Sequence, residues 1–354
     1  MTKHSTAPIA ITLGDPAGIG PEVIARVYAA AQGQPFNAVV VGCAWSLEQA
    51  CRLVEEHSQA SPGLRVEKLS GLERFKPAAG VVPVLDIGVE KPQPFRYGAV
   101  QAGCGAIAVA CVETAIQLAL AGSVSAMVTC PLNKEAIHAA GFTRDIGHQE
   151  ILARMTGSPW TATLLMTPGL KVVHLSTHKS LIEAARYVTQ ATIEEKLVLT
   201  QETLARWGLT SPRIAIAALN PHGGEGGLLG REEIEEIAPA VASLKAGGMN
   251  VVGPIPADSV FNRAICGEFD VVLALYHDQG HIAIKVHNFA ESVTATLGIP
   301  FVRTSVDHGT AFDIAGKGVA DPRSLLAALN TAAVLVAGEL GTSQHLSTSA
   351  REST

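Results

Sequence analysis

The sequence lacks the charge and the long apolar runs that would assign it to several classes of protein. Charged residues make up 16% of 354 residues and the net charge is −6, whereas about a quarter of the residues in soluble domains are charged. Lys and Arg form no cluster, which argues against nucleic-acid binding. No run of about 18 apolar residues occurs, and the most apolar stretch, 105–121, contains Glu113 and Gln117. That stretch is predicted to be a buried helix rather than a membrane span.

Features of exported proteins are absent as well. The first eight residues are polar and lack the apolar segment of a secretory signal. The six cysteines form no CxxC pair, and 47% hydrophobic residues suffice for a core without disulfides. We therefore expect a cytoplasmic protein whose cysteines are reduced and buried.

The glycine-rich segments lack the common nucleotide-binding signatures. GDPAGIGPE (14–22) is not GxGxxG, and no Walker A motif is present. NPHGGEGGLLG (220–230) is typical of a flexible loop. HGTAFDIAGKG (308–318) predicts a tight turn rich in backbone N–H donors.

β-rich apolar runs alternate with amphipathic helical patterns along the chain. The predicted strands are 9–13, 38–41, 81–87, 126–129, 172–175, 214–218 and 271–275, and the clearest predicted helices are 21–31, 99–121, 193–207 and 232–246. This alternation indicates an α/β protein with a largely parallel sheet. The length suggests two domains or one large unit. We expect the polar tail, 341–354, to be frayed.

Three histidines come directly after predicted strands: His178, His222 and His277. Ligands of open α/β sheets bind at the carboxyl ends of the strands, and three imidazoles leave a metal with open positions for catalysis. The alternative is that each histidine is a hydrogen-bonded loop residue. Asp278 is suited to orient a ligand imidazole.

The remaining histidine patterns are weaker. His174 alternates within a strand and is expected in the core. His277 and His281 have the i, i+4 spacing of a zinc-binding helix, but Gly280 between them argues against a helix.

Two cations and one helix start are candidates for binding an anion. GHQE (147–150) precedes an apolar helix, so its backbone amides could bind phosphate. Lys285 and Arg303 have mostly apolar neighbours in sequence. Each is therefore either half of a buried ion pair or a ligand contact.

Taken together, the motifs resemble the 4-hydroxythreonine-4-phosphate dehydrogenase family, including its 4-phospho-threonate and 4-phospho-erythronate dehydrogenase paralogues. The segments that carry the resemblance are GDPAGIGPE, PLNKEAIHAAG, GHQE, STH, NPHGGEGG, YHDQG and LGIPFVRTSVDHGTAFDIAGKG, in this order between about residues 9 and 337. The resemblance implies an enzyme of pyridoxine biosynthesis or a paralogue. It also implies an α/β fold like that of isocitrate and isopropylmalate dehydrogenases, with two α/β/α subdomains around a central cleft. The expected subdomains are 1–143 with 316–354, and 144–315, the second carrying the metal and dimer contacts.

The resemblance also implies ligands and partners. The chain would be an NAD(P)-dependent oxidoreductase that acts on a CH–OH group, with NAD as the expected cofactor and NADP possible, and one divalent metal (Zn, Co, Ni, Mn or Mg). It would form a homodimer with the active site at the subunit interface. The implied residues are His178, His222 and His277 for the metal; His148, Gln149, Lys285, Thr294 and Arg303 for the substrate; and His308, Gly309, Asp313 and Asp321 for the cofactor. Asp278 and Lys285 are the candidates for catalytic roles.

The implied reaction is oxidation of a phosphorylated hydroxy acid, 4-hydroxythreonine 4-phosphate or 4-phospho-threonate/erythronate, to a 3-oxo acid that loses CO2. The metal would stabilise the alkoxide; the general base stays open between Asp278 and a metal-bound water. The alternative is a related branch that oxidises an unphosphorylated aromatic cis-dihydrodiol. Arg303, which that branch lacks, favours a phosphate. Gln149 and Thr294 stand where the family has Thr and Asn, and this predicts a shift toward a phosphorylated sugar acid.

Overall fold

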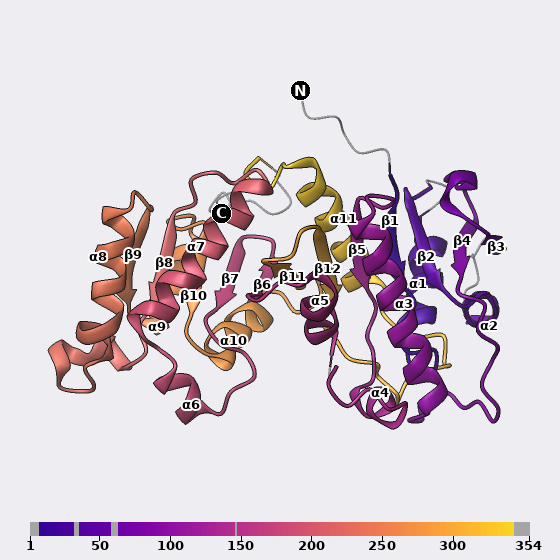
Figure 1. Ribbon diagram of the computed structural model, residues 1–354, viewed down its shortest axis with the longest axis horizontal. Helices are drawn as coiled ribbons and strands as arrows, with labels where there is room; N and C mark the ends of the chain where they lie inside the picture. Colours follow the sequence, from indigo (N-terminus) through magenta and orange to yellow (C-terminus); the bar gives the residue numbers. More distant parts are fainter. Residues whose placement is uncertain (1–6, 32–34, 58–62, 146, 343–354) are drawn as a thin grey trace. The chain divides into compact units, whose positions relative to one another are not determined.

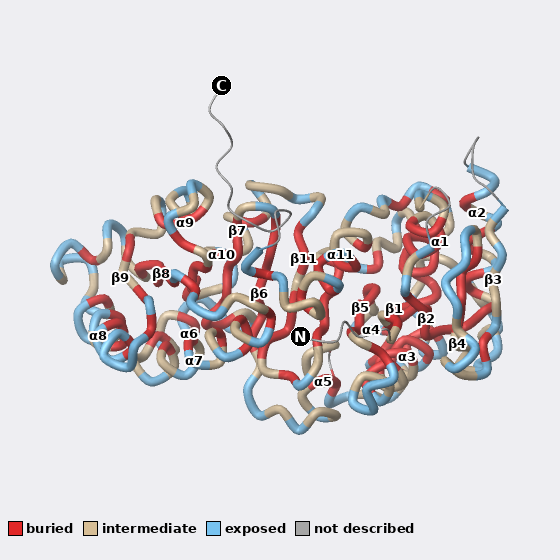
Figure 2. The backbone as a smooth tube through the Cα atoms, turned by 90° about the horizontal axis from the view of Figure 1, so that it is seen from above, coloured by how far each residue is buried: buried red, intermediate tan, exposed pale blue. Residues whose placement is uncertain are grey.

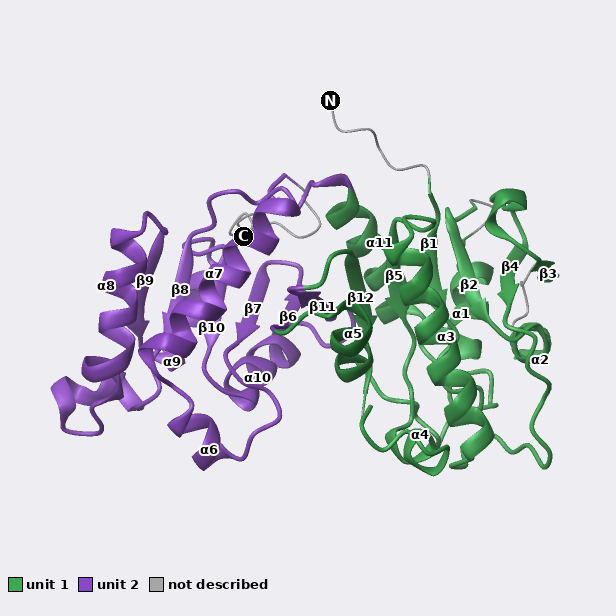
Figure 3. Ribbon diagram, in the orientation of Figure 1, with its two compact units in different colours: residues 1–159, 299–336 green, residues 160–298, 337–354 purple. Residues whose placement is uncertain are grey.

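The computed structural model describes residues 7–31, 35–57, 63–145 and 147–342. These residues form two compact units, residues 1–159 with 299–336 and residues 160–298 with 337–354 (Figure 3). The division falls at 159 and 298 rather than at the expected 143 and 315. Most of the tail that was expected to fray lies outside the described residues.

Unit 1 contains a six-stranded parallel sheet in the order β3-β4-β2-β1-β5-β12 (Figure 1). Its strands are β1 (Ile9–Thr12), β2 (Ala38–Gly42), β3 (Arg65–Leu69), β4 (Val81–Asp86), β5 (Ala126–Thr129) and β12 (Val302–Val306). Its helices are α1 (Gly20–Ala30), α2 (Ala44–His57), the 3-10 turn η1 (Leu72–Arg74), α3 (Ala102–Leu120), α4 (Lys134–Ala139), α5 (His148–Thr156) and α11 (Arg323–Ala337). The sheet is parallel, as the alternation of strands and helices predicts.

Helix α3 lies at the centre of this unit. Within the described residues it is the one helix long and apolar enough to cross a membrane, and half of its most apolar window is buried. It packs against β1, β2 and β5 and against α4 and α5. The buried helix predicted at 105–121 is therefore confirmed as a core element.

Unit 2 contains strands in the order β11-β6-β7-β10-β8-β9. Its strands are β6 (Ala162–Thr167), β7 (Leu170–His174), β8 (Ile214–Ala217), β9 (Val251–Ile255), β10 (Val271–Ala274) and β11 (Val293–Leu297). Its helices are α6 (Leu181–Arg186), α7 (Gln190–Arg206), η2 (Pro221–Gly227), the π-turn η3 (Glu233–Ile237), α8 (Ala238–Ala246), α9 (Ala257–Ile265) and α10 (His277–His287). Strand β6 is antiparallel to both of its neighbours, whereas β7, β10, β8 and β9 run parallel.

Burial follows the sheets in both units, where most strand residues are buried (Figure 2). Five of the six cysteines are buried, as predicted, and none is disulfide-bonded. The expectation is wrong for Cys266, which is exposed at the end of α9.

Candidate active site

The three candidate metal histidines follow three neighbouring strands of unit 2. His178 comes after β7, His222 after β8 and His277 after β10, and the sheet places β10 between β7 and β8, all parallel. The carboxyl ends of parallel strands meet at one edge of a sheet. The three side chains therefore start from the same edge, and all three residues are exposed.

The His222 loop has an unusual backbone. His222 has φ 54° and Glu225 has φ 48°, in the left-handed region that residues other than glycine seldom adopt. The buried carboxylate of Glu233 holds the start of the loop, because its Oε1 accepts hydrogen bonds from the backbone N–H groups of Leu219 (2.8 Å) and Asn220 (2.7 Å). Strained backbone that its surroundings hold in place is characteristic of functional loops.

His277 has the partner that a ligand histidine usually has. Its Nδ1 lies 2.7 Å from Asp278 Oδ1, which leaves Nε2 as the nitrogen available to a metal. Gly280 lies inside α10, so the expectation that it excludes a helix here is wrong. The His277 and His281 rings stack face to face, with centroids 3.7 Å apart.

The donor set of three imidazoles and an orienting carboxylate fits a catalytic divalent metal in its chemistry. Within the described part of one chain, however, no three His, Cys, Asp or Glu side chains are grouped closely enough to hold an ion.

The anion-binding candidates of unit 1 are less exposed than these histidines, since Arg303 is buried and His148 and Gln149 are half-buried. Arg303 on β12 is 3% exposed, and its Nη2 donates to Thr129 Oγ1 at 2.6 Å. Burial lowers the pKa of Arg303 to about 9. Burial and the nearby charge of Arg303 hold the pKa of His148 well below its usual range, so this imidazole is neutral at physiological pH. His148 Nε2 is buried with no hydrogen-bond partner among the described residues.

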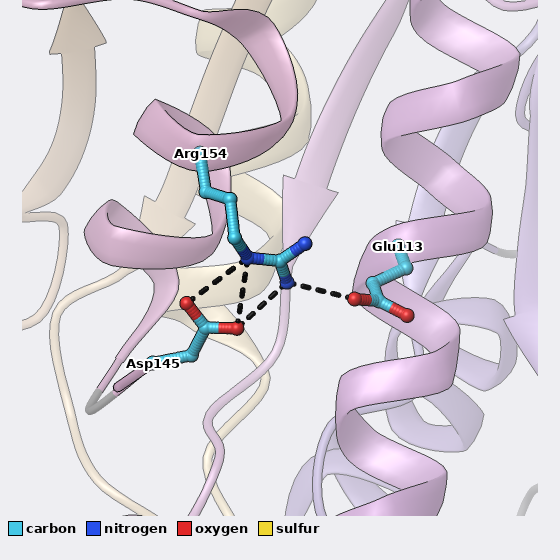
Figure 4. Close-up of polar contacts among 3 residues, drawn as sticks. All are labelled: Glu113, Asp145 and Arg154. Carbon is cyan, nitrogen blue, oxygen red and sulfur yellow. Dashed lines mark hydrogen bonds and ion pairs between the residues drawn. The ribbon is translucent and has the colours of Figure 1, made fainter. Parts of the chain in front are cut away.

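His148 and Gln149 form the first turn of α5, after Gly147 at its N-cap. The helix predicted to follow GHQE is therefore confirmed, although it already begins at His148 within the motif. A three-residue ion-pair network holds this turn in place (Figure 4). Arg154 binds Asp145 with Nε and Nη2, at 3.0 and 2.6 Å to Oδ2, and donates from Nη2 to Glu113 of α3 at 2.8 Å. The network joins both ends of the segment that carries His148 to the central helix of unit 1.

Asp15 is a candidate functional residue to which sequence analysis assigned no role. It follows β1, is fully buried, and accepts the Ala17 N–H through Oδ1 at 2.8 Å. Its Oδ2 has no hydrogen-bond partner within the described residues, and burial raises the pKa of Asp15 to about 6. The sequence does contain a feature that could have identified Asp15, because it is a polar residue that comes just after a strand.

The candidate cofactor segment, 308–321, lies against the start of α1. Thr310 O accepts the N–H of Ile19 at 3.0 Å, and Glu22 Oε1 accepts the N–H of Ala320 at 2.7 Å. Arg26 donates to Gly318 O at 2.6 Å. Two glycine-rich motifs almost 300 residues apart are thus in contact within unit 1.

The cofactor candidates in this segment differ in their surroundings. His308 Nδ1 lies 3.0 Å from Gly309 O, and its Nε2 is buried with no partner in the described part of the chain. Gly309 and Asp313 are exposed. Asp321 is engaged with Arg323, whose backbone N–H it accepts at 2.9 Å at the start of α11. His308 therefore has the clearest unfilled bonding capacity.

The two remaining substrate candidates belong to unit 2. Lys285 on α10 is half-buried; its Nζ lies 3.5 Å from Ser292 Oγ and 4.6 Å from the Phe289 ring centroid. Thr294 on β11 is half-buried and opposite Leu165 of β6.

Comparisons with known proteins agree with these motifs. The family described as pyridoxal phosphate biosynthetic protein PdxA matches residues 34–332. D-threonate 4-phosphate dehydrogenase from Pectobacterium atrosepticum is 43% identical over 324 residues, which cover 92% of this chain and 98% of the relative. The solved structure of 4-hydroxythreonine-4-phosphate dehydrogenase from Klebsiella pneumoniae has a TM-score of 0.84 at 42% identity, covering 93% of this chain and 99% of that one.

A more distant solved structure is that of a terephthalate 1,2-cis-dihydrodiol dehydrogenase from Burkholderia xenovorans. It has a TM-score of 0.63 at 31% identity and covers 93% of this chain and 98% of its own. All three relatives are named dehydrogenases, and the family match at residues 34–332 includes the candidate metal, substrate and cofactor residues that the motifs indicate. The chain belongs to the PdxA family and is an oxidoreductase that acts on a hydroxyl group.

Proposed function

We propose that this protein oxidises D-threonate 4-phosphate or a closely similar phosphorylated hydroxy acid, with NAD as the hydride acceptor. The product is a 3-oxo acid that decarboxylates. The observation that carries the proposal is the placement of three histidines after three adjacent parallel strands, in a chain 43% identical to a relative named for this substrate.

The residues of unit 1 are suited to hold the phosphate. Arg303 supplies a buried guanidinium, which binds phosphate by a pair of parallel hydrogen bonds. His148 is neutral, so it can donate to a phosphate oxygen from one nitrogen without adding a second buried charge. Such binding remote from the reacting carbon contributes orientation. The buried Arg303 also disfavours the unphosphorylated dihydrodiol as the substrate.

His178, His222 and His277 are proposed to hold a divalent metal, with Asp278 orienting the His277 ring through Nδ1. When bound, the metal supplies a Lewis acid that lowers the pKa of the substrate hydroxyl. His308 Nε2, with its unfilled bonding capacity, is suited to contact the nicotinamide cofactor. Nicotinamide is the hydride acceptor in such oxidations.

We also propose a homodimer in the cytoplasm, with the active site shared between subunits. Exposed apolar side chains flank each histidine along the chain: Leu181 is 66% exposed, Leu228 87% and Ile282 60%. Large exposed apolar side chains near functional residues are typical of a protein interface. A second copy of the chain would cover them and supply the ligands that one chain lacks.

The test compares kcat/KM for D-threonate 4-phosphate, 4-hydroxythreonine 4-phosphate and an unphosphorylated diol, each with NAD and NADP and with or without a chelator. The expected result is a chelator-sensitive preference for the sugar acid with NAD. Gln149→Thr with Thr294→Asn should move the preference toward the amino substrate by about tenfold, because mismatched polar groups cost roughly 1–3 kcal/mol. A native enzyme that already prefers the amino substrate tenfold would refute the substrate assignment.

A further inference from the structure

Helix α10 presents two stacked imidazoles on one face. His277 and His281 are one turn apart, and their rings are nearly parallel, with 12° between the planes and 3.7 Å between the centroids. The lone pair of an imidazole nitrogen lies in the plane of its ring, so parallel stacked rings do not point at a common ion. His281 Nδ1 also donates to the carbonyl oxygen of His277 at 3.0 Å. The contact is therefore one of stacking rather than shared coordination.

A third imidazole ring, that of His174, packs against His281 on the side facing β7. His174, at the end of β7, is 1% exposed, and its ring centroid lies 4.6 Å from that of His281. The close approach of α10 to β7 depends on Gly280, since a Cβ at this position would lie 2.3 Å from His174 Nε2. The three rings therefore form a row: His174 on the buried strand β7, then His281, then the exposed candidate ligand His277.

His277 needs such support because its side chain is 45% exposed. An exposed histidine samples several rotamers, and binding a metal would then require ordering the ring. Asp278 can engage only Nδ1, in the plane of the ring. A stacked partner restricts the remaining freedom, rotation out of that plane.

We propose that His281 is a positioning residue that fixes the plane of the His277 imidazole by stacking, so that Nε2 is held ready for the metal. The inference rests on the proposed metal function. Residues that orient a ligand histidine without touching the metal typically contribute ten- to a hundredfold in metal affinity. Stacking needs an aromatic ring at position 281 but no ring nitrogen.

The test measures Co²⁺ affinity by competition with a chelator, and the visible absorption spectrum of the Co²⁺-loaded protein. His281→Ala should weaken Co²⁺ binding about tenfold, whereas His281→Phe, which keeps a ring, should stay within about twofold of native. Val286→Ala on the exposed side of the same helix (Val286 is 81% exposed) is the matched control. If His281→Ala does not fold, His281→Leu, which fills the space without a ring, replaces it in the comparison with His281→Phe.

The outcomes separate the inference from the function on which it rests. Equal losses in His281→Phe and His281→Ala would show that the nitrogen matters and would overturn the stacking role. Native affinity in His281→Ala would also overturn it, while leaving the metal function intact. A native protein that binds no Co²⁺ would overturn the metal function and the inference together.

Discussion

The two units contain chemically active side chains in opposite environments. In unit 1, Arg303 is 3% exposed and Asp15 is fully buried. In unit 2, His178, His222 and His277 are all exposed at the end of a sheet. Burial has already desolvated the guanidinium of Arg303, at a cost that a bound anion can offset, and it raises the pKa of Asp15. The imidazoles of unit 2 are exposed and carry no such desolvation cost.

This difference separates the residues that are proposed to bind the phosphate from those that are proposed to bind the metal. The residues of unit 1 that are proposed to bind phosphate are held by Thr129 and by the Arg154 network within the same unit. The histidines of unit 2 do not form a group of three within the described residues. If the proposed homodimer shares its metal site between subunits, substitutions in unit 1 should act within one subunit, whereas those at the histidines should depend on the partner.

The largest effect is expected at Arg303. Arg303→Met should lower kcat/KM for the phosphorylated substrate by two to three orders of magnitude, because losing one member of a buried charge pair costs about 2–5 kcal/mol. The free energy of unfolding without substrate should fall by less than about 2 kcal/mol, since the cost of burying the guanidinium also disappears. Steady-state kinetics and urea denaturation measure both quantities. Arg144→Met, at an exposed arginine of unit 1, is the control, and equal losses in the two variants would contradict the assignment.

The proposal that the histidines of unit 2 belong to a site shared between subunits can be tested by complementation. His178→Ala and His277→Ala should each be inactive as homodimers. In the proposed arrangement, His178 and His277 of one chain belong to different active sites. A purified heterodimer of the two variants then has one intact site and should recover about half of the native activity. His138→Ala, at an exposed histidine of α4, should not impair activity. A verified heterodimer that stays inactive would count against a site shared in this way.

The buried carboxylate of unit 1 should make stability depend on pH. Asp15 titrates at about 6 in the folded protein and near 4 when unfolded, so between these values the folded state holds a proton that the unfolded state has released. The free energy of unfolding therefore falls as pH rises from about 4 to about 6, and stays lower above that. Asp15→Asn should remove this slope and stabilise the protein at pH 8 by up to about 3 kcal/mol.

Urea denaturation from pH 4.5 to pH 8 would measure this slope. Asp258→Asn, at an exposed carboxylate of unit 2, serves as the control and should leave the slope as it is in the native protein. An unchanged slope in Asp15→Asn would refute the role of Asp15.

The smallest effect is expected from the partly exposed network of Figure 4. Arg154→Met removes the links from α5 to Asp145 and Glu113. Because Arg154 is 48% exposed, we expect a loss of about 1 kcal/mol in stability and a several-fold rise in KM as the His148 turn loosens. Arg206→Met, on α7 of unit 2, should leave KM unchanged. A fall in kcat without a change in KM would argue against a role in substrate positioning.

The sequence by itself determined the alternation of strands and helices, the core helix α3 and the position of three histidines after strands. These features depend on local patterns, such as β-rich apolar runs and helical periodicity. The motifs also identified the family, because GHQE, NPHGGEGG and YHDQG occur together and in order. Some local predictions nevertheless failed. Gly280 was expected to exclude a helix, yet packing of α10 against β7 outweighs the modest cost of one glycine in a helix.

Only the tertiary structure decided which of these residues become neighbours and which are buried. Sheet order places β10 between β7 and β8, and no local pattern encodes that order because it depends on pairing between distant segments. The contact of α1 with the 308–321 segment and the stacking of His281 between β7 and His277 arise in the same way. The role of Arg303 was likewise left open by sequence, since a cation among apolar residues is either half of a buried ion pair or a ligand contact. Packing decided the burial of this side chain by placing β12 inside the sheet beside β5, where every residue of the strand is buried and the guanidinium is removed from water.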